Sequence, residues 1–183
     1  GIYLEDELEF SCHNSLKLNG SFGYHQNKVA NEFGLESLQI FYPEMADKQN
    51  RLLKSISMQY KHQVKDWFFS VGSGYGERAP SVTEGYAFYI FNSFDLFDYI
   101  GNPNLSNEKS VEGNFDIRYK TEKIKTGITF SAFYLPDYII GIPDDNLIPM
   151  TIGASGVKIY EQLSFANLIH SSFQFDYRFN DYY

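Results

Sequence analysis

The segment ISMQYKHQVKDWFFSVGSGY, residues 56–75, decides the fold class. From Ile56 to Val64 every second side chain is apolar or aromatic, and the side chains between them are polar. After Lys65-Asp66 the same period of two runs from Trp67 to Tyr75, with serine and glycine filling most of the opposite positions. A period of two is typical of a strand with one apolar face. Two such runs joined by a two-residue connection predict a β-hairpin.

The same alternation recurs along the chain. In the first run Glu5, Glu7 and Glu9 share one face, and three unpaired carboxylates in a row cannot lie in a dry core, so this face meets water. No segment shows a comparably persistent helical period, and we therefore predict an all-β chain. The further runs lie at residues 2–10, 16–24, 111–119, 124–134 and 172–179.

The connections between these runs alternate between short and long. Long segments run roughly over 26–51, 77–110 and 137–156. Short turns at one end and long loops at the other are the arrangement of outer-membrane barrels. The sequence therefore predicts about seven antiparallel strands of a transmembrane β-barrel, with the long loops on the extracellular side. The short turns are predicted at Ser11–Asn14, Lys65-Asp66, Thr121–Lys123 and Asn180-Asp181.

The composition agrees with a membrane barrel. Aromatic residues make up 18% of the chain, a heavy load for a water-soluble domain, and several stand at the ends of the apolar faces, where a ring with a polar edge suits the membrane–water interface. The net charge of −8 argues against a nucleic-acid partner, which needs a basic face. A single cysteine, Cys12, excludes an intrachain disulfide framework. The interfacial aromatic residues are Tyr24, Tyr60, Trp67, Tyr75, Tyr119 and Tyr134.

The odd strand number predicts an incomplete barrel. Bacterial single-chain barrels have an even number of strands, and an unpaired strand edge cannot face lipid. We expect residues 1–183 to form part of a single outer-membrane β-barrel domain that belongs to a longer protein. A soluble lipocalin-like barrel, with its apolar residues inside, is the alternative that alternation alone leaves open.

Two elements between the predicted strands carry a family resemblance. The first is Gly76-Glu77-Arg78-Ala79-Pro80-Ser81 with Glu84 a few residues on, and the second runs from Gly101-Asn102-Pro103-Asn104-Leu105 to Glu108. Together they resemble the barrel of TonB-dependent outer-membrane receptors. The resemblance implies a bacterial outer-membrane location and a plugged barrel of roughly 22 strands. It further implies active import of a scarce nutrient such as a siderophore, a metal complex or cobalamin.

The resemblance also implies partners. These are outer-membrane lipid, a small extracellular ligand such as a metal chelate, and periplasmic TonB, which such receptors contact through a plug domain. We expect no plug domain within this chain, so no residue here is assigned to energy coupling. The alternative hypothesis is a passive porin- or adhesin-type barrel, because such a barrel would have the same wall and loops.

The motif residues have a physical interpretation of their own. Pro80 and Pro103 fix φ and remove backbone donors, so they end strand pairing at the base of a loop. Asn102-Pro103-Asn104 is a turn signal. Arg78 is expected to pair with Glu84 or Glu108 and to hold the loop at the barrel mouth. We interpret these residues mainly as loop scaffolding and only secondarily as ligand contacts.

Ligand contacts are expected from the loops. The aromatic residues of the second long segment either stack on a flat ligand or pack the loop, and packing is the interpretation that we favour. Metal-ligand types occur in the first and third long segments without convincing spacing, so we predict neither a metal site nor a cofactor; they are His25, Met45, Asp47, Asp144-Asp145 and Met150. Four histidines without a matching nucleophile give no catalytic triad, and the chain is not expected to be an enzyme. The candidate ligand-binding residues are Tyr86, Tyr89, Phe91, Tyr99 and Met150.

Overall fold

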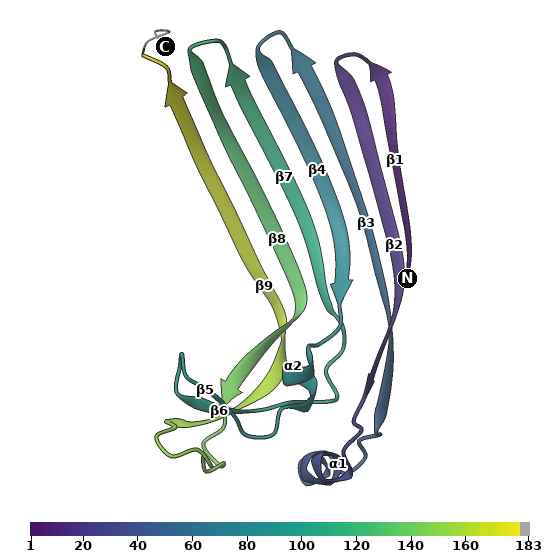
Figure 1. Cartoon of the computed structure of the whole chain (residues 1–183), viewed down its shortest axis with the longest axis vertical. Coiled ribbons are helices and arrows are strands. Elements are labelled where there is room, and N and C mark those ends of the chain that lie inside the picture. Colours follow the sequence, from purple (N-terminus) through teal and green to yellow (C-terminus); the bar gives the residue numbers. More distant parts are fainter. Residues whose placement is uncertain (180–183) are drawn as a thin grey trace.

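The computed structural model describes residues 1–179, and within them the chain forms one open sheet of nine strands with two short helices. Seven long strands lie side by side in antiparallel order, and two short strands extend the sheet beyond the last of them (Figure 1). The long strands are β1 (Ile2–Ser11), β2 (Asn14–Lys28), β3 (Lys48–Val64), β4 (Trp67–Arg78), β7 (Glu108–Lys120), β8 (Ile124–Pro143) and β9 (Gly156–Tyr177).

The seven long strands confirm the predicted all-β barrel segment. The sheet does not close on itself within the described residues, because β1 and the short strand β5 form its two edges. Strand β5 (Ile90–Asn92) pairs with β6 (Phe97–Ile100), which adds in parallel to β9. Both short strands belong to the connection between β4 and β7, so they are loop structure added to a seven-stranded wall.

Tight turns and long connections lie at opposite ends of the sheet, as predicted (Figure 1). The turn at Lys65-Asp66 uses a positive φ of 52° at Lys65. The long connections are shorter than predicted, covering residues 29–47, 79–107 and 144–155, because the strands continue further. The predicted turn at Asn180-Asp181 lies outside the described residues.

Strands β8 and β9 correct the predicted boundaries most. Strand β8 continues past the expected end near Tyr134 to Pro143, and β9 begins at Gly156 although clear alternation starts only at residue 172. The extra lengths pair with one another from Pro136–Phe165 to Pro143–Lys158. Here loops cover the sheet and bury residues such as Ile139 and Val157, so the contrast between an apolar and a polar face disappears from the sequence.

Two helices that the alternation did not predict occur inside the long connections. Helix α1 (Glu32–Gln39) begins after Asn31, whose side chain accepts a hydrogen bond from the Gly34 amide. Helix α2 (Val82–Tyr86) begins at Ser81 with a capping box that Glu84 completes. Both are too short to produce a persistent helical period. No helix within residues 1–179 is long and apolar enough to cross a membrane.

Register places apolar side chains on one face of the wall and polar side chains on the other. Tyr60, Val71, Phe115 and Phe130 lie opposite one another on neighbouring strands and form the apolar face at mid-height. One residue along, Lys61, Ser70, Asp116 and Thr129 form the polar face. Val71 is 50% exposed and Phe130 is 43% exposed, so this chain does not cover its own apolar face.

The core of the described structure lies at the loop end. Its buried side chains come mainly from the long connections and from the strand ends that these connections cover. A soluble sheet protein would bury the apolar face of its strands instead. The buried apolar residues are Leu38, Met45, Ala87, Tyr99, Ile100, Leu105, Ile139 and Val157.

Candidate functional site

The connection between β4 and β7, residues 79–107, is the most elaborately folded part of the loop end, and we call it the second long loop. Its chain doubles back so that the Gly101 amide donates to Ala87 O (2.8 Å) and the Asn102 amide donates to Glu84 O (2.8 Å). A Cβ at Gly101 would lie 2.4 Å from Tyr86 N, so only glycine permits this close approach. The loop is therefore a compact unit that presents fixed side chains.

Arg78 joins this loop to the wall. Its Nη1 donates to Glu84 Oε2 (2.7 Å) and its Nε donates to Glu108 Oε1 (2.9 Å), while Nη2 reaches a second oxygen on each carboxylate at 3.0 Å. The predicted pairing of Arg78 is therefore present with both glutamates at once. The guanidinium lies at the point where β4 ends, α2 begins and β7 starts.

Electrostatics favour the charged form of this cluster. Hydrogen bonds to Glu84 outweigh desolvation and raise the pKa of Arg78, with Glu108 adding to the effect. Burial by itself would raise the pKa of Glu84, but the hydrogen bonds from Arg78 and Ser81 lower it below its ordinary value. The Glu84 and Glu108 side chains are mostly buried, at 15% and 11% exposed. Loss of Arg78 would therefore leave two carboxylates with little access to water.

The prolines and asparagine of the two motifs are also held within the loop base. Pro80 and Pro103 are buried. The Pro103 carbonyl accepts from Gln49 Nε2 of β3 (2.5 Å), and Asn102 Oδ1 accepts from the Asn104 amide (3.0 Å). These contacts give all six motif residues a place in one scaffold. Whether any of them also contacts a ligand stays a prediction.

The five candidate ligand residues do not share one environment. Tyr99 is only 9% exposed, donates to Asp95 Oδ2 (2.6 Å) and packs on Tyr160 with ring centroids 5.1 Å apart. Tyr89, with a positive φ of 51°, packs on Phe88 and on Phe41 of the first loop. Phe91 is 37% exposed and Met150 is 65% exposed, whereas Tyr86 is half-buried. The geometry favours packing for Tyr99 and leaves the other four available.

Three charged residues that the sequence did not single out tie the loops together. Asp98, fully buried, accepts from the amides of Met150 and Thr151 through Oδ2, each at 2.8 Å. Lys158 of β9 donates to Asp95 Oδ2 (2.7 Å). These partners are more than 50 residues apart in the chain, so no local motif could have indicated them.

The metal-ligand types considered from the sequence are not assembled in the described structure. Within residues 1–179 no group of three or more histidine, cysteine, aspartate or glutamate side chains is placed to hold a metal ion.

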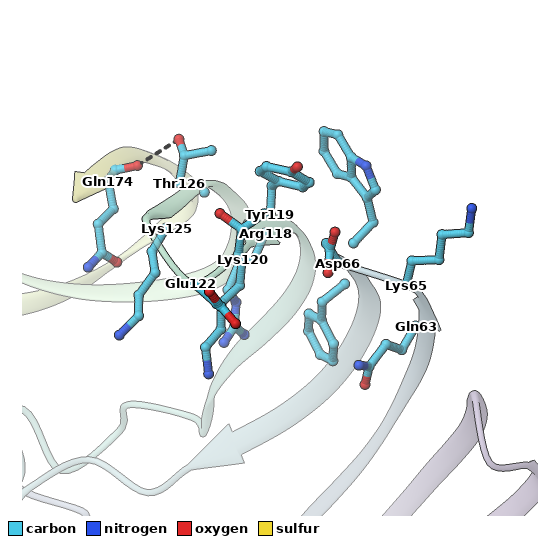
Figure 2. Close-up of a pocket in the computed structure, with 14 residues that line it drawn as sticks. Gln63, Lys65, Asp66, Arg118, Tyr119, Lys120, Glu122, Lys125, Thr126 and Gln174 are labelled. Atoms are coloured by element: carbon cyan, nitrogen blue, oxygen red, sulfur yellow. Dashed lines mark hydrogen bonds between the residues drawn. The ribbon is translucent and has the colours of Figure 1, made fainter. Parts of the chain in front are cut away.

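A hollow of about 720 Å³ lies at the opposite end of the wall, among the tight turns (Figure 2). Figure 2 shows Lys120 and Lys125 on one side of their strands and Tyr119 and Thr126 on the other. The two lysines are directly opposed in register, an arrangement that like charges disfavour. Arg118 pairs with Asp116 (2.5 Å) and lies over the Phe68 ring (4.7 Å). No predicted ligand residue lies here.

Comparisons with known proteins agree on the architecture. The family model described as "TonB dependent receptor-like, beta-barrel" matches residues 1–159. No curated protein sequence matches significantly. A solved structure titled "Copper transporter OprC" is similar over 97% of this chain and 25% of its own, at 15% identity and a TM-score of 0.73.

Two further solved structures are similar. The hemophore receptor HasR from Serratia marcescens, solved with its hemophore and heme, matches 96% of this chain and 31% of its own, at 13% identity and a TM-score of 0.62. The siderophore receptor PirA from Pseudomonas aeruginosa is similar over 98% of this chain and 39% of its own, at 13% identity and a TM-score of 0.58. At these identities the likeness concerns the fold alone. The chain spans between a quarter and two fifths of the length of these structures.

Proposed function

This chain belongs to the TonB-dependent receptor-like β-barrel family, and from that premise we propose that it forms one sector of a receptor that imports a scarce nutrient. Members of the family are receptor and transporter barrels of the bacterial outer membrane, and they are not enzymes. The observation that carries the proposal is a wall of seven strands with tight turns at one end and folded loops at the other. All of residues 1–183 are assigned to this one barrel domain.

The apolar face supports contact with outer-membrane lipid. Its side chains remain largely exposed across all seven strands, which in water would be a strong liability. At the turn end Trp67 and Tyr119 pack in a tilted arrangement with ring centroids 4.8 Å apart, as expected of an aromatic girdle at the inner interface. The polar face, with ion pairs such as Lys17–Glu5 at 2.5 Å, then faces the lumen.

The loop end supports binding of the nutrient from outside the cell. The second long loop is fixed by Arg78 and presents Tyr86, Tyr89 and Phe91, while Met150 comes from the third loop. The similar structures are named for copper, a siderophore and a hemophore with heme, so a metal chelate is the ligand class proposed here. Coupling to TonB would run through a plug outside this chain.

The orientation can be tested with the protein's own cysteine. Cys12 is exposed in the tight turn between β1 and β2, and Phe94, which is 98% exposed, lies in the second long loop. In intact cells a membrane-impermeant maleimide should label Phe94→Cys and spare Cys12, with labelling read by peptide mass spectrometry. Permeabilising the outer membrane should make Cys12 reactive. Labelling of Cys12 in intact cells would contradict the orientation.

Transport is tested by growth of a deletion strain under limitation of iron, copper or cobalamin, with and without TonB. The proposed function expects a growth defect for one nutrient that is as large in the TonB-deficient strain as in the deletion strain. A passive porin or adhesin would keep the same labelling pattern but show no dependence on TonB.

A further inference from the structure

The polar face of β2 and β3 carries an unusual arginine close to the loop end. Register places Arg51 opposite His25 and Gln49 opposite Asn27, all on the face that Lys61 and Gln59 share nearer the tight turns. The Arg51 side chain is half-buried, and its Nη2 donates to Gln49 Oε1 (2.7 Å). Each neighbour in this group is neutral or weakly basic.

The second long loop covers this arginine. Gln49 Nε2 donates to Pro103 O (2.5 Å), which holds residues 101–103 against β3. Gly101 in turn packs against the backbone of Tyr86, so this tyrosine belongs to the part of the loop that Gln49 holds. Gln49 thus contacts both the Arg51 guanidinium and the loop that carries Tyr86, which brings the two residues to the same end of β3.

Arg51 is a half-buried cation that pairs with no anion among residues 1–179. No ion pair joins it to any carboxylate of residues 1–179, although the chain has a net charge of −8. Arg78, Arg118 and Lys158, by contrast, each contact an acidic side chain.

Two polar atoms at this place have no partner. The Arg51 Nε and Tyr86 hydroxyl atoms are both buried, and neither has a hydrogen-bond partner among the described residues 1–179. Leaving a buried donor unsatisfied is costly, and more so for a charged group. An arginine Nε–H can only donate, and a tyrosine hydroxyl donates readily to a charged oxygen. The missing partner is therefore an acceptor, and a negatively charged one would also balance the guanidinium.

We propose that Arg51 and Tyr86 form a subsite for an oxyanion, a carboxylate, phosphate or sulfate group, carried by the imported ligand. The inference rests on the proposed function, because it places a ligand group on the lumen side of the loop end. The planar guanidinium suits the two oxygens of such a group, and the phenol supplies a further hydrogen bond. Gln49 holds the guanidinium in place from the side that the anion does not occupy.

The subsite is tested on the complete receptor in detergent, with inorganic phosphate as the calorimetric probe and selenate as the probe in crystals. Wild-type receptor should bind phosphate, and an anomalous selenium peak should lie against Arg51 and Tyr86. Arg51→Gln should weaken phosphate binding about tenfold or more, as expected for loss of charge-assisted hydrogen bonds. Tyr86→Phe should weaken phosphate binding by about threefold to tenfold. The phosphate affinity of Arg51→Lys should lie between those of wild type and Arg51→Gln.

Arg118→Gln is the matched control, because it removes an arginine from the same polar face at the other end of the wall. Its phosphate affinity should equal that of the wild type. Since Arg51→Gln could disturb the loop, exchange of the Asn102 amide is followed in each variant, and Tyr86→Phe keeps the packing of the ring. Equal phosphate affinity in Arg51→Gln and wild type would overturn the proposal.

Two other results would also overturn it. One is the absence of any phosphate or selenate binding, and the other is a protein carboxylate from outside this chain lying on Arg51 Nε in the complete receptor. Neither result touches the labelling of Cys12 or the dependence of growth on TonB. Conversely, phosphate binding at Arg51 in a receptor whose uptake is independent of TonB would leave the subsite standing and refute the proposed function.

Discussion

Replacing Arg78 by alanine should release the second long loop from the barrel wall without disturbing the wall itself. The variant removes four hydrogen bonds and leaves Glu84 and Glu108 facing each other without a cation. Both carboxylates keep one backbone partner, because Glu84 still accepts from the Ser81 amide and Glu108 still accepts from the Ile139 amide. The loss is therefore smaller than for a fully buried pair.

The magnitude follows from exposure. Removing one partner of a buried ion pair costs about 3–5 kcal/mol, whereas an exposed pair contributes about 0–1 kcal/mol. Arg78 is 45% exposed and its partners are 15% and 11% exposed, so we place the cost between these limits at about 2 kcal/mol. About 1.4 kcal/mol is a factor of ten, and the local opening equilibrium should therefore rise about 30-fold.

Hydrogen exchange read by mass spectrometry measures this directly. The amides of Gly101 and Asn102, which donate to Ala87 and Glu84, should exchange about 30-fold faster in Arg78→Ala. The Lys120 amide, which donates to Asp66 at the turn end, should be unchanged and serves as the internal reference. Arg78→Lys keeps the positive charge but loses the paired N–H donors of the guanidinium, so its exchange rates should lie between those of wild type and Arg78→Ala. A change of less than about threefold at Gly101 and Asn102 would refute the reasoning.

Three further predictions concern the same end of the molecule. Gly101→Ala should destabilise the second long loop by about 1–3 kcal/mol, because the added carbon meets Tyr86 N at 2.4 Å, and limited proteolysis of the loop should become faster. In the control Gly85→Ala the added carbon meets nothing within 4 Å, so limited proteolysis should be unchanged. Asp98→Ala should make the Met150 and Thr151 amides exchange about tenfold faster, and an unchanged rate would show that its carboxylate does not hold the third loop. The pKa of Glu84 lies below its ordinary value of 4.5. The stability that ionised Glu84 gives the loop is therefore complete above pH 4.5 and is lost as the pH falls through the lower pKa of the folded state. Loop proteolysis should rise at that pH in wild type but show no such step in Glu84→Gln.

Much of the wall could be predicted because its determinants are local. Alternation from Ile56 to Val64 and from Trp67 to Tyr75 fixes which side chains share a face, and Lys65-Asp66 fixes the turn between them. The pairing of Arg78 with both glutamates was within reach because Arg78, Glu84 and Glu108 stand next to strand ends. The first half of β9 was missed, because loops cover that part of the sheet and its two faces no longer differ in polarity.

The loop-end contacts could not be predicted in the same way. Asp98 meets Met150 across 52 residues, and the short helices α1 and α2 interrupt connections that carry no persistent period. Arg51 lies in a predicted long connection, so its place on the polar face of β3 was not visible, and neither was its lack of a carboxylate.

The sequence by itself determined the alternating strands, the sorting of short and long connections and the two motifs around Arg78 and Asn102, because each depends on residues close together in the chain. Only the tertiary structure decided that the loop end is a folded unit, that Tyr99 packs inside it, and that Arg51 and Tyr86 meet there without an anion. The physical reason is that burial and hydrogen-bond partners depend on which distant segments of the chain meet in space. A pattern of neighbouring residues does not indicate which segments these are.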